Sequence, residues 1–200
     1  MSYKKIQLKL TGFQPLMLNN IQTANPLNKW AKKLKEVTSK KKKTDDDTLT
    51  IIEYQFMASW YVDEDGHYVL PSENVLKSFE AGAKEFKKGS KLVENVQIIE
   101  DNLVIKFDGM DKSLEELYDN GNGKYVDTRI CGISSGFGSK AKVLATRALI
   151  DKWSVTATLV YDESQIDLAD ILRAAEIAGQ RKGVGTYRRR FGRYKVEVIK

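Results

Sequence analysis

Residues 153–179 read WSVTATLVYDESQIDLADILRAAEIAG, and this stretch decides the fold. From Trp153 to Tyr161 every second residue is apolar, which predicts a strand with one buried face. From Asp167 to Gly179 most apolar residues fall at spacings of three and four, which predicts a helix with one buried stripe. A strand followed by such a helix favours a sheet whose apolar face is covered by helices.

The same signals extend outward from this stretch in both directions. Alternation predicts further strands, and the apolar spacing around Phe56 and Phe79 predicts two more helices, the second capped by Ser72 and stopped by Gly89. The Asp65–Gly66 pair predicts a hairpin turn. We therefore expect an α+β fold, a ferredoxin-like or RRM-like sandwich with a mainly antiparallel sheet and helices on one face. The expected strands are 3–10, 93–99, 103–107, 142–150 and 194–199, and the expected helices are 48–59, 72–87 and a short one at 114–118.

The length of 200 residues suits one domain over residues 1–200. Two segments interrupt the regular pattern. Residues 29–47 are rich in lysine and look like an insertion, whose part from Ser39 to Asp47 lacks apolar residues and is expected to be mobile. Residues 131–140 are rich in glycine and serine, and we expect a flexible loop there.

Composition excludes several classes of protein. With one cysteine, Cys131, and one histidine, His67, the chain has neither a disulfide framework nor a Cys/His cluster for structural zinc. No apolar run approaches the length of a membrane span, and the lysines of MSYKKIQLKLTG at residues 1–12 argue against a signal peptide. We expect a cytoplasmic protein that uses no cofactor and contacts no membrane.

Positive charge is concentrated in two segments. The formal net charge is +6, of which residues 181–200 carry +7 and the other residues together carry −1. A second basic stretch, Lys29–Lys43, has eight lysines and one acid, Glu36, and is followed by three aspartates. Clustered positive charge of this kind commonly meets polyanions, because neutralising phosphates releases condensed counterions. The lysine run also has a plainer interpretation as a solvated loop.

The segment GVGTYRRRFGRYKV, residues 183–196, contains the densest group of side chains suited to binding a nucleic acid. Its glycines allow a polyanion to approach the main chain, its arginines offer forked charged donors, and its aromatic rings offer faces on which a base can stack. The segment is neither a Walker loop nor a dinucleotide fingerprint, since it trails a helix and no Gly-Lys-Ser/Thr follows. The candidate nucleic-acid contacts here are Lys182, Gly183, Gly185, Tyr187, Arg188, Arg189, Arg190, Phe191 and Arg193, and in the lysine run they are Lys40, Lys41, Lys42 and Lys43.

Three separated stretches resemble the RAMP superfamily (repeat-associated mysterious proteins), the ferredoxin-like or RRM-like subunits of CRISPR effector complexes. IQLKLTGFQPLML at residues 6–18 is similar to the opening strand of that family, and YVLPSENVLKSFEAGAKEF at residues 68–86 to its proline-initiated helix. Residues 183–196 are similar to its carboxy-terminal glycine-rich loop. Together they cover about a quarter of the chain in the family's order, and the resemblance is nearest to compact versions from phages and mobile elements.

The resemblance implies an RNA-binding role, and the departures from the family bear on catalysis. Some backbone subunits cut target RNA with an aspartate in the loop after the first strand, but no acid occurs here before Glu36. The family's processing enzymes typically use a histidine, whereas His67 follows a turn glycine, and Cys131 lacks a histidine partner in sequence. The acidic run Asp63–Asp65 lacks the remaining positions of a calcium loop. We therefore expect no catalytic residue and no metal site.

These observations favour a protein that binds single-stranded RNA or DNA and that self-associates along the strand or joins RAMP-like partners. The family resemblance favours RNA over DNA. Phe137, in the loop 131–140, is a further candidate contact, because insertion loops interrupt a guide strand in the family that the chain resembles. Two alternatives stay open. One is a metal-independent endoribonuclease of the processing type, and the other is a phage structural protein or an interaction protein that antagonises CRISPR complexes.

Overall fold

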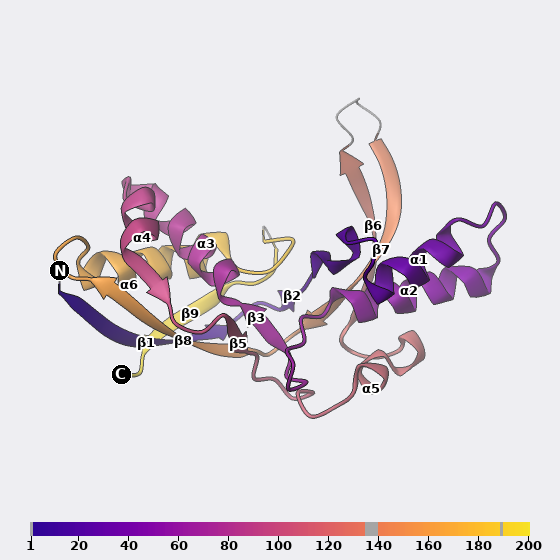
Figure 1. Ribbon diagram of the computed structural model, residues 1–200, viewed down its shortest axis with the longest axis horizontal. Coiled ribbons are helices and arrows are strands. Elements are labelled where there is room, and N and C mark those ends of the chain that lie inside the picture. The colour runs from indigo at the N-terminus through magenta and orange to yellow at the C-terminus, as the bar shows by residue number, and fades with distance from the viewer. Residues whose placement is uncertain (1, 135–139, 189) are drawn as a thin grey trace. The chain divides into compact units, whose positions relative to one another are not determined.

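The computed structural model describes residues 2–134, 140–188 and 190–200 of the chain (Figure 1). These residues form two compact units. Unit 1 comprises Met1–Met17, Tyr61–Met110 and Ile150–Lys200, and unit 2 comprises Leu18–Trp60 and Asp111–Leu149. A single domain over residues 1–200 stays a prediction.

Unit 1 is built on a four-stranded antiparallel sheet in the order β4-β8-β1-β9. The central pair, β1 and β8, places Leu8 opposite Ala157, and Leu8 is also opposite Val198 of β9. Leu8 and Ala157 are both buried, which confirms the alternation on which the sequence prediction rested. The strands are β1 (Tyr3–Gly12), β4 (Val96–Ile98), β8 (Ser154–Asp162) and β9 (Tyr194–Val198).

Helices cover one face of this sheet, as Figure 1 shows for α3, α4 and α6. Phe79 of α3 and Ile171 of α6 are fully buried on the sides that face the core. The α+β fold with an antiparallel sheet and helices on one face is therefore confirmed. The helices are α3 (Ser72–Ala83), α4 (Gly89–Asn95) and α6 (Leu168–Ile177), and two short turns, η2 (Lys84–Phe86) and η4 (Ala178–Lys182), extend α3 and α6.

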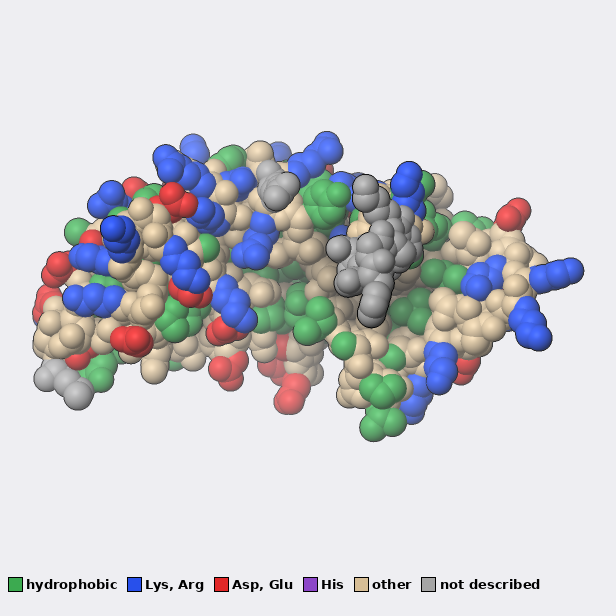
Figure 2. Space-filling model, turned by 90° about the horizontal axis from the view of Figure 1, so that it is seen from above, with side chains coloured by type: hydrophobic (Ala, Val, Ile, Leu, Met, Phe, Trp, Pro, Cys, Tyr) green, Lys and Arg blue, Asp and Glu red, His purple; other side chains and the backbone are tan. Residues whose placement is uncertain are grey.

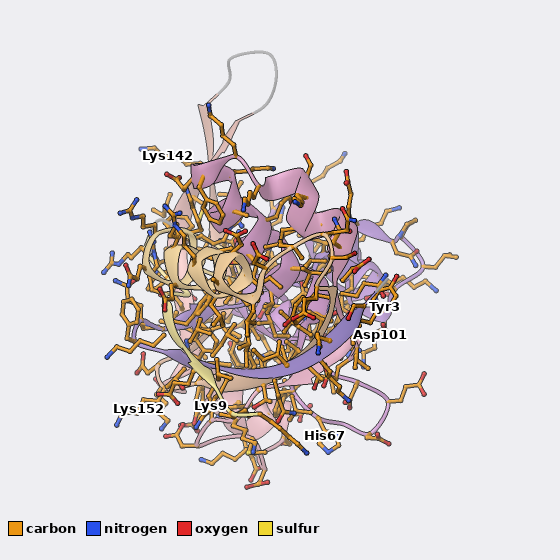
Figure 3. All side chains as sticks on the ribbon, turned by 90° about the vertical axis from the view of Figure 1, so that its left-hand side faces the viewer. Tyr3, Lys9, His67, Asp101, Lys142 and Lys152 are labelled. Carbon is orange, nitrogen blue, oxygen red and sulfur yellow. The ribbon has the colours of Figure 1, made fainter. Side chains whose placement is uncertain are left out.

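The opposite face of the sheet is polar. Lys9 lies on the side away from the helices (Figure 3), and its cross-strand neighbours are Thr156 and Glu197. Gln7 follows on the same face and donates its side-chain amide to the Thr158 hydroxyl at 3.4 Å. None of these residues is aromatic, so this part of the sheet offers no stacking platform for bases.

Three short strands complete unit 1. β2 (Leu16–Met17) follows β1, and β3 (Val69–Pro71) pairs antiparallel with β5 (Asn102–Val104). The predicted hairpin at Asp65–Gly66 is confirmed by the bridge between Val62 and Tyr68.

Three predictions for the middle of unit 1 are wrong in detail. Ser72 is the first residue of α3 and makes no side-chain cap, because Pro71 occupies the cap position. Gly89 begins α4 instead of ending a helix, since the chain reverses two residues earlier at Lys87, whose φ is 62°. The predicted strand 93–99 is thereby shortened to β4, which pairs with β8 and not with its neighbour in sequence.

Unit 2 combines a helical hairpin with a two-stranded ribbon. The insertion is helical: α1 packs against α2, and Trp30 lies 6.0 Å from Tyr54 between ring centroids. α2 begins before the predicted residue 48, because Thr44 and Asp47 form a capping box. The elements are η1 (Ile21–Ala24), α1 (Lys29–Thr38), α2 (Asp45–Ser59), α5 (Leu114–Tyr118), η3 (Asp119–Gly121), β6 (Val126–Ser134) and β7 (Lys140–Ile150).

The ribbon of unit 2 corrects the expected loop at residues 131–140. β6 pairs antiparallel with β7 from Val126↔Ala148 to Ser134↔Lys140, so residues 131–134 belong to a strand. Within the described residues, no helix combines the length and the apolar character needed to cross a membrane.

Candidate nucleic-acid interface

The basic segment near the carboxyl end forms a loop between η4 and β9 in unit 1. We call residues 183–193 the arginine loop, of which Arg189 lies outside the described residues. Backbone hydrogen bonds hold its inner side: Thr186 N donates to Met17 O at 2.9 Å, and Gly192 N donates to Pro15 O at 2.7 Å. The two arms of the loop are joined by Val184 N, which donates to Gly192 O at 2.9 Å. The loop is thus fastened to β2 and to itself.

The glycines of the loop are required by this close packing. Gly185 has φ 75°, and a Cβ built there would lie 2.5 Å from Met17 O. Gly192 also has φ 75°, and its Cβ would lie 1.9 Å from Val184 O. The amide of Gly183 already donates to Ala178 O at 2.8 Å. The structure therefore gives these glycines a packing role, and direct contact of Gly183 and Gly185 with a polyanion stays a prediction.

A buried pair of hydroxyl groups supports the loop from below. Ser78 of α3 is fully buried, and its Oγ donates to Gly183 O at 2.9 Å. The same Oγ lies 2.9 Å from the hydroxyl of Tyr194 on β9. Because the single proton of Ser78 goes to the carbonyl, the Tyr194 hydroxyl is the donor in the second bond. Burial raises the pKa of Tyr194, which keeps that donor protonated.

Replacing Ser78 tests this support. Ser78→Ala leaves the Gly183 carbonyl and the Tyr194 hydroxyl without a buried partner, which is expected to lower the free energy of unfolding by about 1–3 kcal/mol. Ser90→Ala, on the exposed side of α4, is the matched control and should change it by less than about 0.5 kcal/mol. Urea denaturation measures both. Equal effects of the two variants would contradict the assigned role of Ser78.

The outer side of the loop presents two uncommitted guanidinium groups. Arg188 and Arg190 are exposed, and within the described residues neither forms an ion pair with a carboxylate. The Arg190 guanidinium lies 5.5 Å from the centroid of the Phe191 ring. Guanidinium groups that are unpaired and solvent-facing are free to take the forked geometry that phosphate accepts.

The two aromatic residues of the loop have different surroundings. Tyr187 is 48% exposed, and Phe191 is only 6% exposed. The ring centroids lie 6.4 Å apart, so Phe191 packs behind Tyr187. Tyr187 has φ 55°, a left-handed conformation that costs free energy in a non-glycine residue. We therefore assign Phe191 to the support of the loop, and Tyr187 is the more exposed ring of the two.

Two predicted contacts, Lys182 just before the loop and Arg193 at its end, are held by other groups of unit 1. Lys182 forms an ion pair with Glu85, and its hydrogen bond lowers the pKa of that carboxyl. Arg193 Nη1 donates to Gln180 O at 2.7 Å. Both cations still add positive charge to the surroundings, but their direct contact with a ligand would require these bonds to open.

The helix-covered side of unit 1 is also rich in basic side chains, as Figure 2 shows. Part of this charge is compensated locally, whereas Arg188 and Arg190 of the arginine loop form no ion pair within the described residues. Ion pairs that join neighbouring turns or neighbouring helices screen these lysines, and exposed pairs of this kind contribute little to long-range attraction. The pairs are Lys77–Glu73, Lys84–Glu80 and Lys88–Asp170.

The lysine run of unit 2 forms the turn between α1 and α2. Lys40 Nζ lies 2.6 Å from Asp47, and Lys43 Nζ donates to Lys40 O at 3.1 Å. Lys41 and Lys42 are exposed. Two of the four lysines, Lys40 and Lys43, therefore form contacts within the turn between the helices, and one of these contacts is with an aspartate that follows the run. Binding of nucleic acid by Lys40–Lys43 stays a prediction.

The remaining candidates from the sequence do not form a reactive group in the described residues. Phe137 lies outside the described residues. His67, Asp63 and Asp65 place one ligand atom each within 4.8 Å of one another, but Asp63 Oδ1 accepts the amides of Asp65 and His67, as expected for a turn. Cys131 lies partly exposed on β6.

Comparison with known proteins yields fold neighbours only. No protein-family model matches the chain, and no curated protein matches it. Among solved structures, a chain of the type III-B Cmr-beta complex bound to cognate target RNA aligns with a TM-score of 0.52 and 13% identity. The alignment covers 99% of this chain and 61% of that chain, so our chain spans less than two thirds of its length.

Cmr6 from Pyrococcus furiosus also aligns, with a TM-score of 0.37, 12% identity and full coverage of both chains. At such identities only the Cmr-beta likeness is informative, and it concerns the fold. It supports the α+β fold predicted from the sequence, and membership of the RAMP superfamily stays a prediction.

Proposed function

We propose that this chain is a RAMP-like protein that binds single-stranded RNA through the arginine loop. The observation that carries the proposal is the pair of exposed guanidinium groups of Arg188 and Arg190. Among the residues that the structure describes they have no carboxylate partner, and they lie beside the exposed ring of Tyr187 on a loop held by backbone hydrogen bonds. Charged forks for phosphate and a ring for a base are the two elements of sequence-tolerant single-strand binding. The fold neighbour in the Cmr-beta complex was solved with its target RNA, which agrees with this proposal.

The dependence of affinity on salt tests the proposal. If three to five phosphates are neutralised, the logarithm of the affinity for a single strand should fall against the logarithm of salt concentration with a slope of about −2 to −3.5. Fluorescence anisotropy with a labelled 20-nucleotide RNA, titrated from low to physiological salt, gives that slope. A flat response, or no binding at the lowest salt, would refute RNA binding by charge.

Two further parts of the proposal are tested with the same reagents. We propose that copies of the chain lie side by side on a longer strand, since one such domain covers few nucleotides. Light scattering on a long RNA at saturation should then show more than one chain per strand.

Incubation of labelled RNA in EDTA tests the nuclease alternative, and RNA that stays intact excludes a metal-independent cut.

A further inference from the structure

A pocket of about 230 Å³ lies within unit 2, along the edge of β7 that faces away from β6. Residues of the loop after unit 1's β2, of the two helices α1 and α2, and of β7 itself form its walls. A single cationic side chain, Arg147, lines it among neutral ones. The full lining is Asn19, Asn20, Thr23, Leu34, Gln55, Ala58, Ser59, Ala145, Thr146 and Arg147.

Side-chain amides fix the walls of this pocket. Gln55 of α2 accepts Thr146 N at 2.8 Å through Oε1 and donates to Leu144 O at 3.3 Å through Nε2, so one amide takes the place of a neighbouring strand. Asn20 accepts Gln22 N at 3.0 Å and donates to Trp60 O at 2.9 Å. These amides are committed to the protein, and they leave the recognition of a ligand to Arg147.

The guanidinium of Arg147 is oriented by one hydrogen bond, and its terminal amino groups are left to bind a ligand. Its Nε donates to Asn19 Oδ1 at 3.2 Å. Its cross-strand neighbour is Asp127, yet the carboxylate of Asp127 accepts two hydrogen bonds from Arg129. Within the described residues, the terminal amino groups of Arg147 therefore have no acceptor. A guanidinium that is oriented through Nε and open at both terminal amino groups is arranged to bind a planar pair of acceptors.

The lining favours a nucleobase over a phosphate as the source of these acceptors. Arg147 is the one charged residue of the lining, and Leu34, Ala58 and Ala145 offer apolar contact to the face of a flat ring. The adjacent acceptors O6 and N7 of guanine match an arginine fork. We propose that this pocket receives one unstacked guanine of a bound single strand, with Arg147 donating to its O6 and N7. The inference rests on the proposed function, since it supposes that RNA is the ligand.

Two RNAs that differ in one atom test the proposal. Each is a 12-nucleotide oligouridine with one central purine, guanosine in the first and 7-deazaguanosine, which lacks the N7 acceptor, in the second. The natural chain should bind the guanosine RNA about ten-fold more tightly by fluorescence anisotropy. Arg147→Lys keeps the charge but has no fork, so it should bind both RNAs equally. Arg173→Lys, on α6 of unit 1, is the matched control and should keep the ten-fold difference.

The outcomes separate this inference from the proposed function. Equal binding of both RNAs by the natural chain, with the usual salt slope, overturns the guanine pocket and leaves RNA binding intact. Loss of affinity for both RNAs in Arg147→Gln, which removes the charge, together with a smaller salt slope and an unchanged difference between the two RNAs, assigns Arg147 to phosphate and also overturns it. No binding of either RNA at low salt refutes the proposed function and the pocket together. Circular dichroism of each variant verifies that it is folded.

Discussion

Reversing the charge of Arg188 and Arg190 together is expected to lower the affinity for single-stranded RNA by at least about 100-fold at physiological salt. Both side chains lie on the exposed side of the arginine loop and form no ion pair within the described residues, so their replacement by glutamate breaks no such internal bond. If each contacts one phosphate, the salt slope should become shallower by about 1.4, since each single-strand phosphate contributes about 0.7. Anisotropy over a salt series measures both quantities.

A second double variant controls for net charge. Lys4→Glu with Lys77→Glu changes the formal charge by the same amount, at two exposed residues of unit 1 that are already ion-paired with Glu163 and Glu73. Its affinity should fall by no more than about ten-fold, and its salt slope should stay near that of the natural chain. Equal losses in the two double variants would show that the protein attracts RNA by its overall charge, and the arginine loop would no longer be the site.

The regular part of unit 1 was predictable because its signals are local and repeated. The alternation in residues 3–10 and 153–161 sets which side chains face the helices, and Leu8 and Ala157, which pair in the structure, both lie on that face. The apolar spacing of α3 and α6 works in the same way. In these elements a single face is buried, so the apolar positions in the sequence identify the side chains that face the core.

Other elements depend on partners that the sequence does not display. The chain leaves α3 at Lys87 in a left-handed conformation, where a glycine is the usual signal, and so Gly89 was assigned to the wrong end of a helix. β6 has no clean alternation and contains Gly132, yet nine residue pairs with β7 define it as a strand. A strand of this kind forms because a neighbouring strand pairs with it, and the sequence of the strand alone does not reveal that pairing.

The candidate site also combines features that the local sequence reveals with features that depend on residues distant in sequence. The arginines and aromatic residues of the loop were visible as a cluster of charge and rings, but the groups that hold the loop were not. Ser78 lies between Val75 and Phe79 on the buried side of α3, and a serine in such a stripe is a signal of a buried hydrogen bond. Its partner, Gly183 O, is distant in sequence. Arg147 was missed because its hydrogen-bond partner Asn19 and the pocket residue Gln55 come from a loop and a helix that are distant in sequence.

Replacing Gly192 by alanine is expected to destabilise the protein severely. The residue has φ 75°, which costs an alanine about 1–2 kcal/mol. The added Cβ would also lie 1.9 Å from Val184 O. This backbone atom cannot easily move away, because the amide of the same residue, Val184 N, is hydrogen-bonded to Gly192 O. We expect the free energy of unfolding to fall by about 4 kcal/mol or more, a large share of the stability of a typical domain.

Gly66→Ala provides a matched control for the backbone conformation alone. Gly66 has φ 85°, but a Cβ there would meet nothing within 4 Å, so its replacement should cost only about 1–2 kcal/mol. The difference between the two variants in urea denaturation then measures the packing of the arginine loop against itself. Similar losses in both would mean that residues 184 and 192 separate at little cost, and the fastened loop on which the proposed interface depends would be contradicted.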